Sequence, residues 1–233
     1  MIKKKIIYIA EFSLPNMSAY AVHVLKMCDN FCKHGDVELI IPHKKGSYIF
    51  KKIKKEYLLK ENFKITSLFS SKKRPSLFSR IYFSLKINNY LNLNNYNMII
   101  SRSIISSLML AFLGKKNILE IHSEMTGSTK YLFKISKLYF VRKNLKFILL
   151  HSKLLKILKI KSKNFCFLED AVQKEDFSNN QQKMKKFTCA YSGSFAKGKG
   201  LETIYAIANK APHIKFDLFG NRKTMDYNLS LKK

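Results

Sequence analysis

The chain has 233 residues, of which 46% are apolar, and it carries a formal net charge of +29 at pH 7. This length is enough for one large domain, or for one domain and part of a second, and the apolar content predicts a packed core rather than a disordered chain. Only five of the 44 basic residues are arginine, so the composition is poor in the planar groups with which nucleic-acid-binding proteins contact bases and phosphates.

Short apolar runs alternate along the chain with longer stretches of helical periodicity. In chain order we expect a strand at 6–10, a helix at 18–34, a strand at 37–41, a charged helix or loop at 44–60, a strand at 65–68, a helix at 76–91, a strand at 98–101, a helix at 104–113, a strand at 118–121, a helix at 127–141, a strand at 147–150, a helix near 154–160 and a strand at 165–168. Strands separated by helices predict an α/β fold with a parallel sheet covered on both faces. Right-handed crossovers make a Rossmann-like layer the default arrangement.

The chain is expected to divide into three parts. Residues 173–186 lose the apolar periodicity and are rich in Asn, Gln and Lys, which predicts a linker after a first domain spanning 1–172. Residues 187–233 hold about one βαβ unit, with strands at 188–192 and 214–219 around a helix at 200–209. Such a unit buries too little surface to be stable alone, so we expect it to be a partial domain.

The loop inside this last unit, AKGKG, is rich in glycine and lysine. It leads into a helix, whose free N–H groups and dipole favour an anion such as a phosphate. The spacing is neither a Walker A loop nor a dinucleotide GxGxxG. Lys197, Lys199 and Gly200 are therefore candidates for phosphate binding, and a solvated basic turn is the alternative.

The segment 191–220, YSGSFAKGKGLETIYAIANKAPHIKFDLFG, resembles the start of the donor-binding domain of family-4 glycosyltransferases. In that family a Gly-x-loop-Lys-Gly element binds the diphosphate of a nucleotide sugar. By this resemblance Lys199–Gly200 is the matching pair, and Gly193 and Ser194 lie in the turn before it. The family commonly has an arginine where this chain has Ser194, and Lys197 is the candidate substitute.

Two places in the first domain resemble the acceptor side of the same family. In the run PNMSAYAVHV, Asn16 and Ser18 lie at a helix start that either residue can cap, where the family's loop borders acceptor and donor phosphate. His23, deeper in that helix, is expected in the core or at the surface. Arg102 matches a strand-Arg-Ser-helix pattern, and it can either bind an acidic acceptor group or cap a neighbouring helix.

His122 ends the expected strand ILEIH, at the carboxyl end where open α/β sheets bind their ligands. It resembles a family histidine that faces the donor sugar, which makes it the candidate catalytic residue. Glu120 is expected to be structural.

The resemblance implies a GT-B fold, in which a Rossmann-like N-terminal domain precedes a second Rossmann-like domain that is incomplete here. It implies a retaining, hexosyltransferase-type enzyme of cell-envelope polysaccharide synthesis that uses no metal or other cofactor. The sugar would pass from a nucleotide-diphosphate donor to a glycan or lipid-linked acceptor. The family's two glutamates, seven residues apart, lie beyond the end of this chain. We therefore expect a truncated protein that is inactive or only weakly active unless a second chain supplies the rest.

The location and the charge leave alternatives open. The four cysteines form no CxxC pair, and the apolar run near the N-terminus is too short for a signal peptide, which predicts a cytoplasmic protein. Lysines mixed with aromatic residues over 130–163 predict either a solvated helix face or peripheral contact with the inner face of an anionic membrane. The lysine excess also fits a simple compositional bias. The alternative function is a non-catalytic basic module, or a partner subunit, that docks on anionic membrane or, less expected, on nucleic acid.

Overall fold

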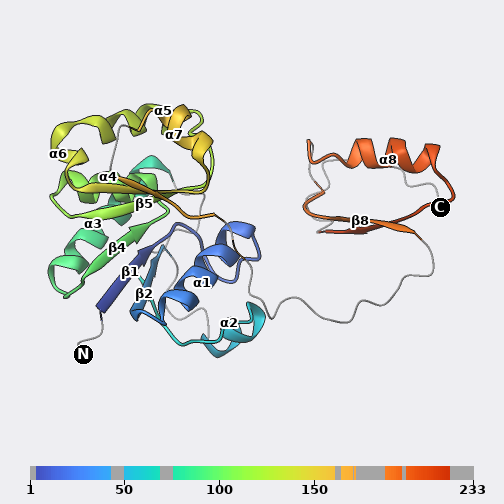
Figure 1. Cartoon of the computed structure of the whole chain (residues 1–233). Helices are drawn as coiled ribbons and strands as arrows, with labels where there is room; N and C mark the ends of the chain where they lie inside the picture. Colours follow the sequence, from blue (N-terminus) through green and yellow to red (C-terminus); the bar gives the residue numbers. More distant parts are fainter. Residues whose placement is uncertain are drawn as a thin grey trace. The chain divides into compact units, whose positions relative to one another are not determined.

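The computed structural model describes residues 4–42, 50–68, 76–160, 164–169, 171, 187–195 and 198–220. The chain forms two compact units, Met1–Ala171 and Val172–Lys233 (Figure 1). The predicted linker, 173–186, and Lys197 lie outside the described residues. Across the ranges that are described, no helix is long and apolar enough to cross a membrane.

The first unit is built on a seven-stranded sheet with the order β3-β2-β1-β4-β5-β6-β7. The strands are β1 (Lys4–Ile9), β2 (Gly35–Ile41), β3 (Lys64–Ser67), β4 (Met98–Ser101), β5 (Asn117–Ile121), β6 (Leu145–Leu149) and β7 (Phe165–Phe167). Every pairing is parallel, so all the carboxyl ends share one edge of the sheet. The chain runs outward from β1 to β3 and then returns to β4 on the other side of β1. The strand order therefore reverses between β1 and β4, and the carboxyl edge at such a reversal is the usual ligand position in sheets of this kind.

The connecting helices confirm the predicted alternation. They are α1 (Ala19–Phe31), α2 (Phe50–Glu56), α3 (Leu77–Asn92), α4 (Ile104–Phe112), α5 (Ser128–Phe133), α6 (Tyr139–Arg142) and α7 (Ser152–Leu158), with the 3-10 turn η1 (Lys134–Lys137) between α5 and α6. The single helix expected at 127–141 is wrong, because Leu138 is extended (φ −63°, ψ 137°) and separates η1 from α6. Just before this break the Ser136 hydroxyl donates to the Phe133 carbonyl at 2.6 Å, a local bond of the kind that competes with regular helix.

The inner strands β1, β2, β4, β5 and β6 are mostly buried on both faces, as is typical of parallel sheets between two helical layers. On one face, Tyr8 and Leu39 pack with residues of α1 and α2. On the other face, Ile7 and Ile99 pack with α3. Further along the sheet, a third group that includes Phe147 packs with residues of α4, α5, α6 and α7.

Gly35 allows the first two strands to meet. It pairs with Lys4 in β1, and a Cβ atom at this position would lie 2.0 Å from the Lys4 carbonyl oxygen. This oxygen belongs to the backbone of a sheet, so no side-chain rotation relieves the clash. Gly35→Ala is expected to lower the free energy of unfolding by about 1–3 kcal/mol, measured by urea denaturation. Alanine at the exposed neighbour His34 should change it by less than about 0.5 kcal/mol, and an equally small effect at Gly35 would contradict the close approach.

The described residues of the second unit form a βαβ motif. The parallel strands β8 (Thr188–Ser192) and β9 (Lys215–Phe219) are joined through α8 (Leu201–Lys210), close to the predicted ranges. Gly200 precedes α8 with φ 83°, a left-handed conformation that glycine adopts without steric cost. The segments that follow β8 and β9 lie close together, because the Gly193 N–H donates a hydrogen bond to the Phe219 carbonyl at 2.9 Å. A Cβ atom at Gly220 would lie 2.1 Å from the Gly193 carbonyl oxygen, so only glycine fits there.

Candidate functional site

A buried carboxylate organises the carboxyl edge of the large sheet. The side chain of Glu120 is only 1% exposed. Its Oε2 accepts a hydrogen bond from the Tyr8 hydroxyl, and its Oε1 lies 2.8 Å from His23 Nε2 and also contacts His122 Nε2. Arg102 Nε lies 3.8 Å from the same Oε1. We call these five residues the Glu120 cluster.

Strand register and helix placement bring the Glu120 cluster together. Tyr8 is aligned with Ile100, and Ile100 with Ile118, so Glu120 lies two residues closer to the carboxyl edge on the same face. His122 follows the end of β5. His23 lies one turn into α1, the helix that covers this face.

The two histidines form the accessible part of the cluster. Their rings are 4.5 Å apart between centroids and meet edge to face at 83°. The side chain of His23 is 22% exposed and that of His122 is 19% exposed, in contrast to the buried Glu120. Since Nε2 of each ring engages the carboxylate, Glu120 fixes the orientation of both rings at the edge of the sheet.

The contacts of Glu120 determine its charge. Burial opposes ionisation, but hydrogen bonds from His122, His23 and Tyr8, together with the charge of His23, hold the pKa of Glu120 well below its usual range. Burial, reinforced by the nearby Glu120 charge, raises the pKa of Tyr8 well above its ordinary value. The cluster therefore consists of an ionised carboxylate and a neutral phenol that donates to it.

This shift makes stability depend on pH. Because the pKa of Glu120 in the folded state lies below the unfolded value of about 4.3, its stabilising contribution is complete above about pH 5. The contribution is lost as the pH falls from there toward the folded-state pKa. Urea denaturation at about pH 6 and about pH 3.5 is expected to show a smaller decrease in unfolding free energy for Glu120→Gln than for the wild type. Equal decreases would mean that other carboxylates govern the acid response.

A second carboxylate, Glu11, follows β1 at the same edge. It accepts hydrogen bonds from Arg80 Nε and from the Ser103 hydroxyl. The Glu11 backbone N–H donates to the Tyr20 hydroxyl at 3.2 Å, and the guanidinium of Arg102 stacks on the Tyr20 ring at 4.4 Å from its centroid. These contacts connect the end of β1 with the end of β4, across the point where the strand order reverses.

Arg102 contacts the Glu120 carboxylate and the Tyr20 ring. Its side chain is only 10% exposed, and its Nη1 is buried with no hydrogen-bond partner among the described residues. Of the two sequence-based interpretations, capping does not apply to α4, whose N-cap is Ser103 with its hydroxyl accepting from the Ser106 N–H. An unsatisfied guanidinium N–H is costly in a protein interior, and a ligand oxygen would satisfy it.

The loop between β1 and α1 contains Asn16 and Ser18, and polar groups of both residues form hydrogen bonds within the protein. Ser18 is the N-cap of α1 and accepts from the Ala21 N–H at 3.3 Å. The Asn16 side chain accepts from the Ser18 N–H at 2.9 Å. The Asn16 backbone also exchanges hydrogen bonds with the Tyr57 hydroxyl. Contact of either side chain with a phosphate stays a prediction.

The candidate donor-phosphate residues lie in the second unit. Gly193 and Ser194 follow β8, and the Ser194 carbonyl accepts from the Tyr191 hydroxyl at 2.9 Å. Lys199 is exposed and immediately precedes Gly200, the N-cap of α8. Gly193 and Ser194 thus follow β8 and Lys199 and Gly200 precede α8 in the second unit, whereas the Glu120 cluster belongs to the first unit.

The atoms of three residues in the Glu120 cluster could also act as metal ligands. One nitrogen of His23, one nitrogen of His122 and one oxygen of Glu120 lie within 4.8 Å of one another, and zinc binds such groups. However, each histidine nitrogen is already directed at the carboxylate, and Arg102 adds a positive charge nearby. Hydrogen bonding therefore accounts for the arrangement by itself.

Sequence reasoning placed His122 and Arg102 at the carboxyl edge, where both are found. It missed His23 and gave Glu120 only a structural role, yet these two residues connect the site. The available signal was the i, i+2 spacing of Glu120 and His122, which directs two neighbouring side chains of a strand to the same face. No comparable pattern pointed to Glu11.

No protein-family model matches the chain, and no curated protein matches its sequence. Solved structures match its fold. A glycosyltransferase from Rickettsia africae ESF-5 has a TM-score of 0.63 at 12% identity, covering 96% of this chain and 69% of that one. Phytolacca americana UGT2, complexed with UDP-2fluoro-glucose and pterostilbene, has a TM-score of 0.53 at 11% identity, covering 95% and 72%. UDP-N-acetylglucosamine 2-epimerase from Rickettsia bellii has a TM-score of 0.53 at 10% identity, covering 95% of this chain and 63% of that one.

At such low identity these similarities establish the fold and nothing further. The chain has the Rossmann-like α/β architecture of GT-B proteins, as predicted. It spans about two thirds of the length of the structures it matches.

Proposed function

We propose that this chain is a glycosyltransferase that moves a sugar from a nucleotide-diphosphate donor to a glycan or lipid-linked acceptor. The observation that carries the proposal is the Glu120 cluster, a group of oriented and partly accessible side chains at the carboxyl edge of a sheet shared with glycosyltransferases. UGT2 was solved with a UDP sugar, and the epimerase is named for one. Nucleotide sugars are therefore the ligand class that its fold relatives suggest.

The proposed chemistry divides between the two units. His122, held in place by Glu120, would contact the donor sugar, and the unsatisfied Arg102 would receive an acidic group of the acceptor. Asn16 and Ser18 would border this site. We propose retention of configuration, hexosyl transfer and no metal requirement as the finer features of the reaction.

The donor diphosphate would lie at the start of α8. Lys199 supplies a positive charge there, and the N-terminal end of the α8 dipole favours an anion. Gly193, Ser194 and Lys197 would complete the loop around the diphosphate. Stabilising a departing diphosphate in this way is electrostatic catalysis.

The first test is donor binding by calorimetry with UDP, GDP and their sugars. Lys199→Ala is expected to weaken binding by about tenfold or more, since a charged hydrogen bond contributes about 1.5–3 kcal/mol. Lys210→Ala, at the opposite end of α8, makes the same change of charge and should leave binding unchanged. Equal losses in both variants, or binding that falls steeply with salt without preference among nucleotides, would instead indicate the alternative, a basic non-catalytic module.

The second test identifies the reaction. A donor that binds should be incubated with glycan and lipid-linked acceptors, and release of the nucleoside diphosphate measured together with the product. Sugar transfer supports the proposal. Conversion of the nucleotide sugar without an acceptor would instead match the epimerase among the fold relatives. Co-purification with a second chain would identify a partner subunit.

A further inference from the structure

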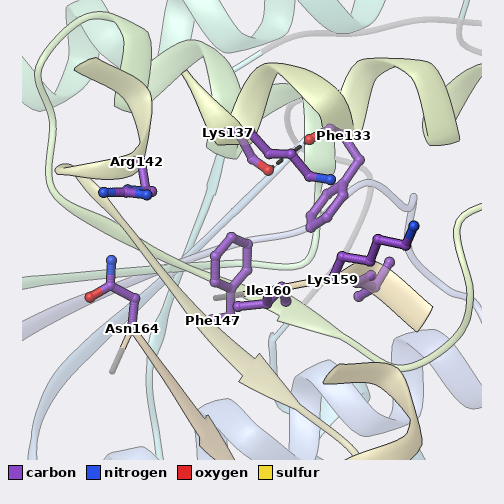
Figure 2. A pocket seen from close by; sticks show the side chains of 9 residues that line it. Phe133, Lys137, Arg142, Phe147, Lys159, Ile160 and Asn164 are labelled. Atoms are coloured by element: carbon purple, nitrogen blue, oxygen red, sulfur yellow. Dashed lines mark hydrogen bonds between the residues drawn. The ribbon is translucent and has the colours of Figure 1, made fainter. Parts of the chain in front are cut away.

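A separate pocket opens at the opposite edge of the large sheet. Its volume is about 330 Å³. Its floor is apolar, with buried Phe133 and Phe147 beside half-buried Ile160 (Figure 2). The buried Leu158 also lines the pocket. Asn164 precedes β7, and its carbonyl accepts from the Phe147 N–H at 2.8 Å. The pocket therefore lies toward the amino ends of β6 and β7, away from the carboxyl-edge Glu120 cluster.

Three cationic side chains surround this apolar floor. Lys137 ends η1, Arg142 ends α6, and Lys159 follows α7 in a left-handed conformation with φ 51°. In Figure 2 Arg142 lies on one side of the pocket, while Lys137 and Lys159 lie on the other. None of the nine lining residues is acidic. The pocket thus combines apolar walls with three cationic side chains and no acidic lining residue.

The same segment exposes aromatic and aliphatic side chains to solvent. Tyr131 in α5 is 69% exposed and Tyr139 in α6 is 75% exposed, and Leu138 and Phe140 are also exposed. Lysines are interspersed among them along the segment from α5 to α6. Exposed tyrosines with nearby lysines are characteristic of surfaces at the interface between a bilayer and water.

We propose that this pocket binds one anionic lipid of a bilayer surface. The lipid phosphate would lie among Lys137, Arg142 and Lys159, and the first part of an acyl chain would pack on Phe133 and Phe147. A free phosphate has no apolar part that could pack against the apolar walls. A neutral lipid has no net negative charge to interact with the three cations. An anionic lipid matches both features of the pocket. Because the pocket lies at the amino edge, this lipid is distinct from any acceptor at the Glu120 cluster.

The test is sedimentation of the full chain with vesicles. One set contains phosphatidylcholine alone, and the other contains equal parts of phosphatidylcholine and phosphatidylglycerol. Binding is expected only to the second set. The double variant Lys137→Ala/Lys159→Ala should bind at least about tenfold more weakly. The matched double variant Lys51→Ala/Lys55→Ala, on exposed positions of α2, removes the same charge and should bind as the wild type does. Equal loss in both variants would overturn the proposal, because it would indicate attraction by the net charge alone.

A second measurement separates a lipid from a free phosphate. Monomeric short-chain phosphatidylglycerol is titrated into the chain, with inorganic phosphate as competitor. Saturable binding that Lys137→Ala/Lys159→Ala abolishes and that phosphate does not displace supports a lipid pocket. Displacement by phosphate at equal concentration, or no binding of the short-chain lipid, overturns it. Circular dichroism melting of each variant confirms that it is folded, and donor binding at α8 should be unaffected.

Discussion

Replacing Glu120 with alanine is expected to lower the free energy of unfolding by about 3–5 kcal/mol, because it removes the centre of a buried charged cluster. The hydroxyl of Tyr8 and Nε2 of His23 would lose their hydrogen-bond partner, and Arg102 would keep its charge without a carboxylate beside it. Equilibrium denaturation in urea at neutral pH gives the value directly.

The matched control is Glu56→Ala. Glu56 pairs with Lys52 at 3.8 Å on the exposed side of α2, and such surface pairs contribute about 0.3–0.5 kcal/mol. In a double-mutant cycle, Glu120→Ala combined with His23→Ala should cost less than the sum of the two single changes, because the second change removes a group that the first leaves unpaired. Strict additivity would show that the two residues are not coupled.

Replacing His122 with alanine is expected to lower the rate of sugar transfer by about 100- to 1,000-fold, the usual cost of losing one oriented polar group at a reacting centre. This prediction rests on the proposed function. It applies to the chain alone or to its complex with a second chain, whichever shows sugar transfer. Donor affinity should change little, because the proposed diphosphate site is at α8, so the loss should fall on kcat rather than on KM.

The control for His122 is His34→Ala, which removes an exposed imidazole after α1 and should leave transfer unchanged. Glu120→Gln gives a second readout, since it retains the shape of the side chain while weakening its hold on the His122 ring. It should reduce kcat less than His122→Ala does. Full activity in His122→Ala would show that His122 has no role in the reaction.

The alternation of strands and helices could be predicted because each strand has a local signature. The run at 98–101 is a strand with the predicted bounds, and Ser18 caps α1 as a polar residue before an apolar helix should. The broken segment from α5 to α6 could not be predicted, since it depends on a hydrogen bond from Ser136 and on the extended backbone of Leu138.

The candidate site was predictable only where it coincides with a strand end. His122 and Arg102 follow strands directly, so their place at the carboxyl edge follows from the topology. The partnership of His23 with Glu120 joins residues 97 positions apart, and it exists because α1 covers the face on which β5 presents its carboxylate. Sequence periodicity describes one helix or strand at a time. It can therefore identify a residue as buried, but it cannot identify the charged residue of another element that lies against it.

The central place of β1 also affects how the chain reaches its native state. Its partner β4 begins at Met98, so during synthesis one edge of an apolar strand stays unpaired until that part of the chain emerges. At about 5–20 residues per second, this interval lasts several seconds. An exposed strand edge can pair with another chain. The nascent protein is therefore most prone to association, and most in need of chaperones, before its fourth strand arrives.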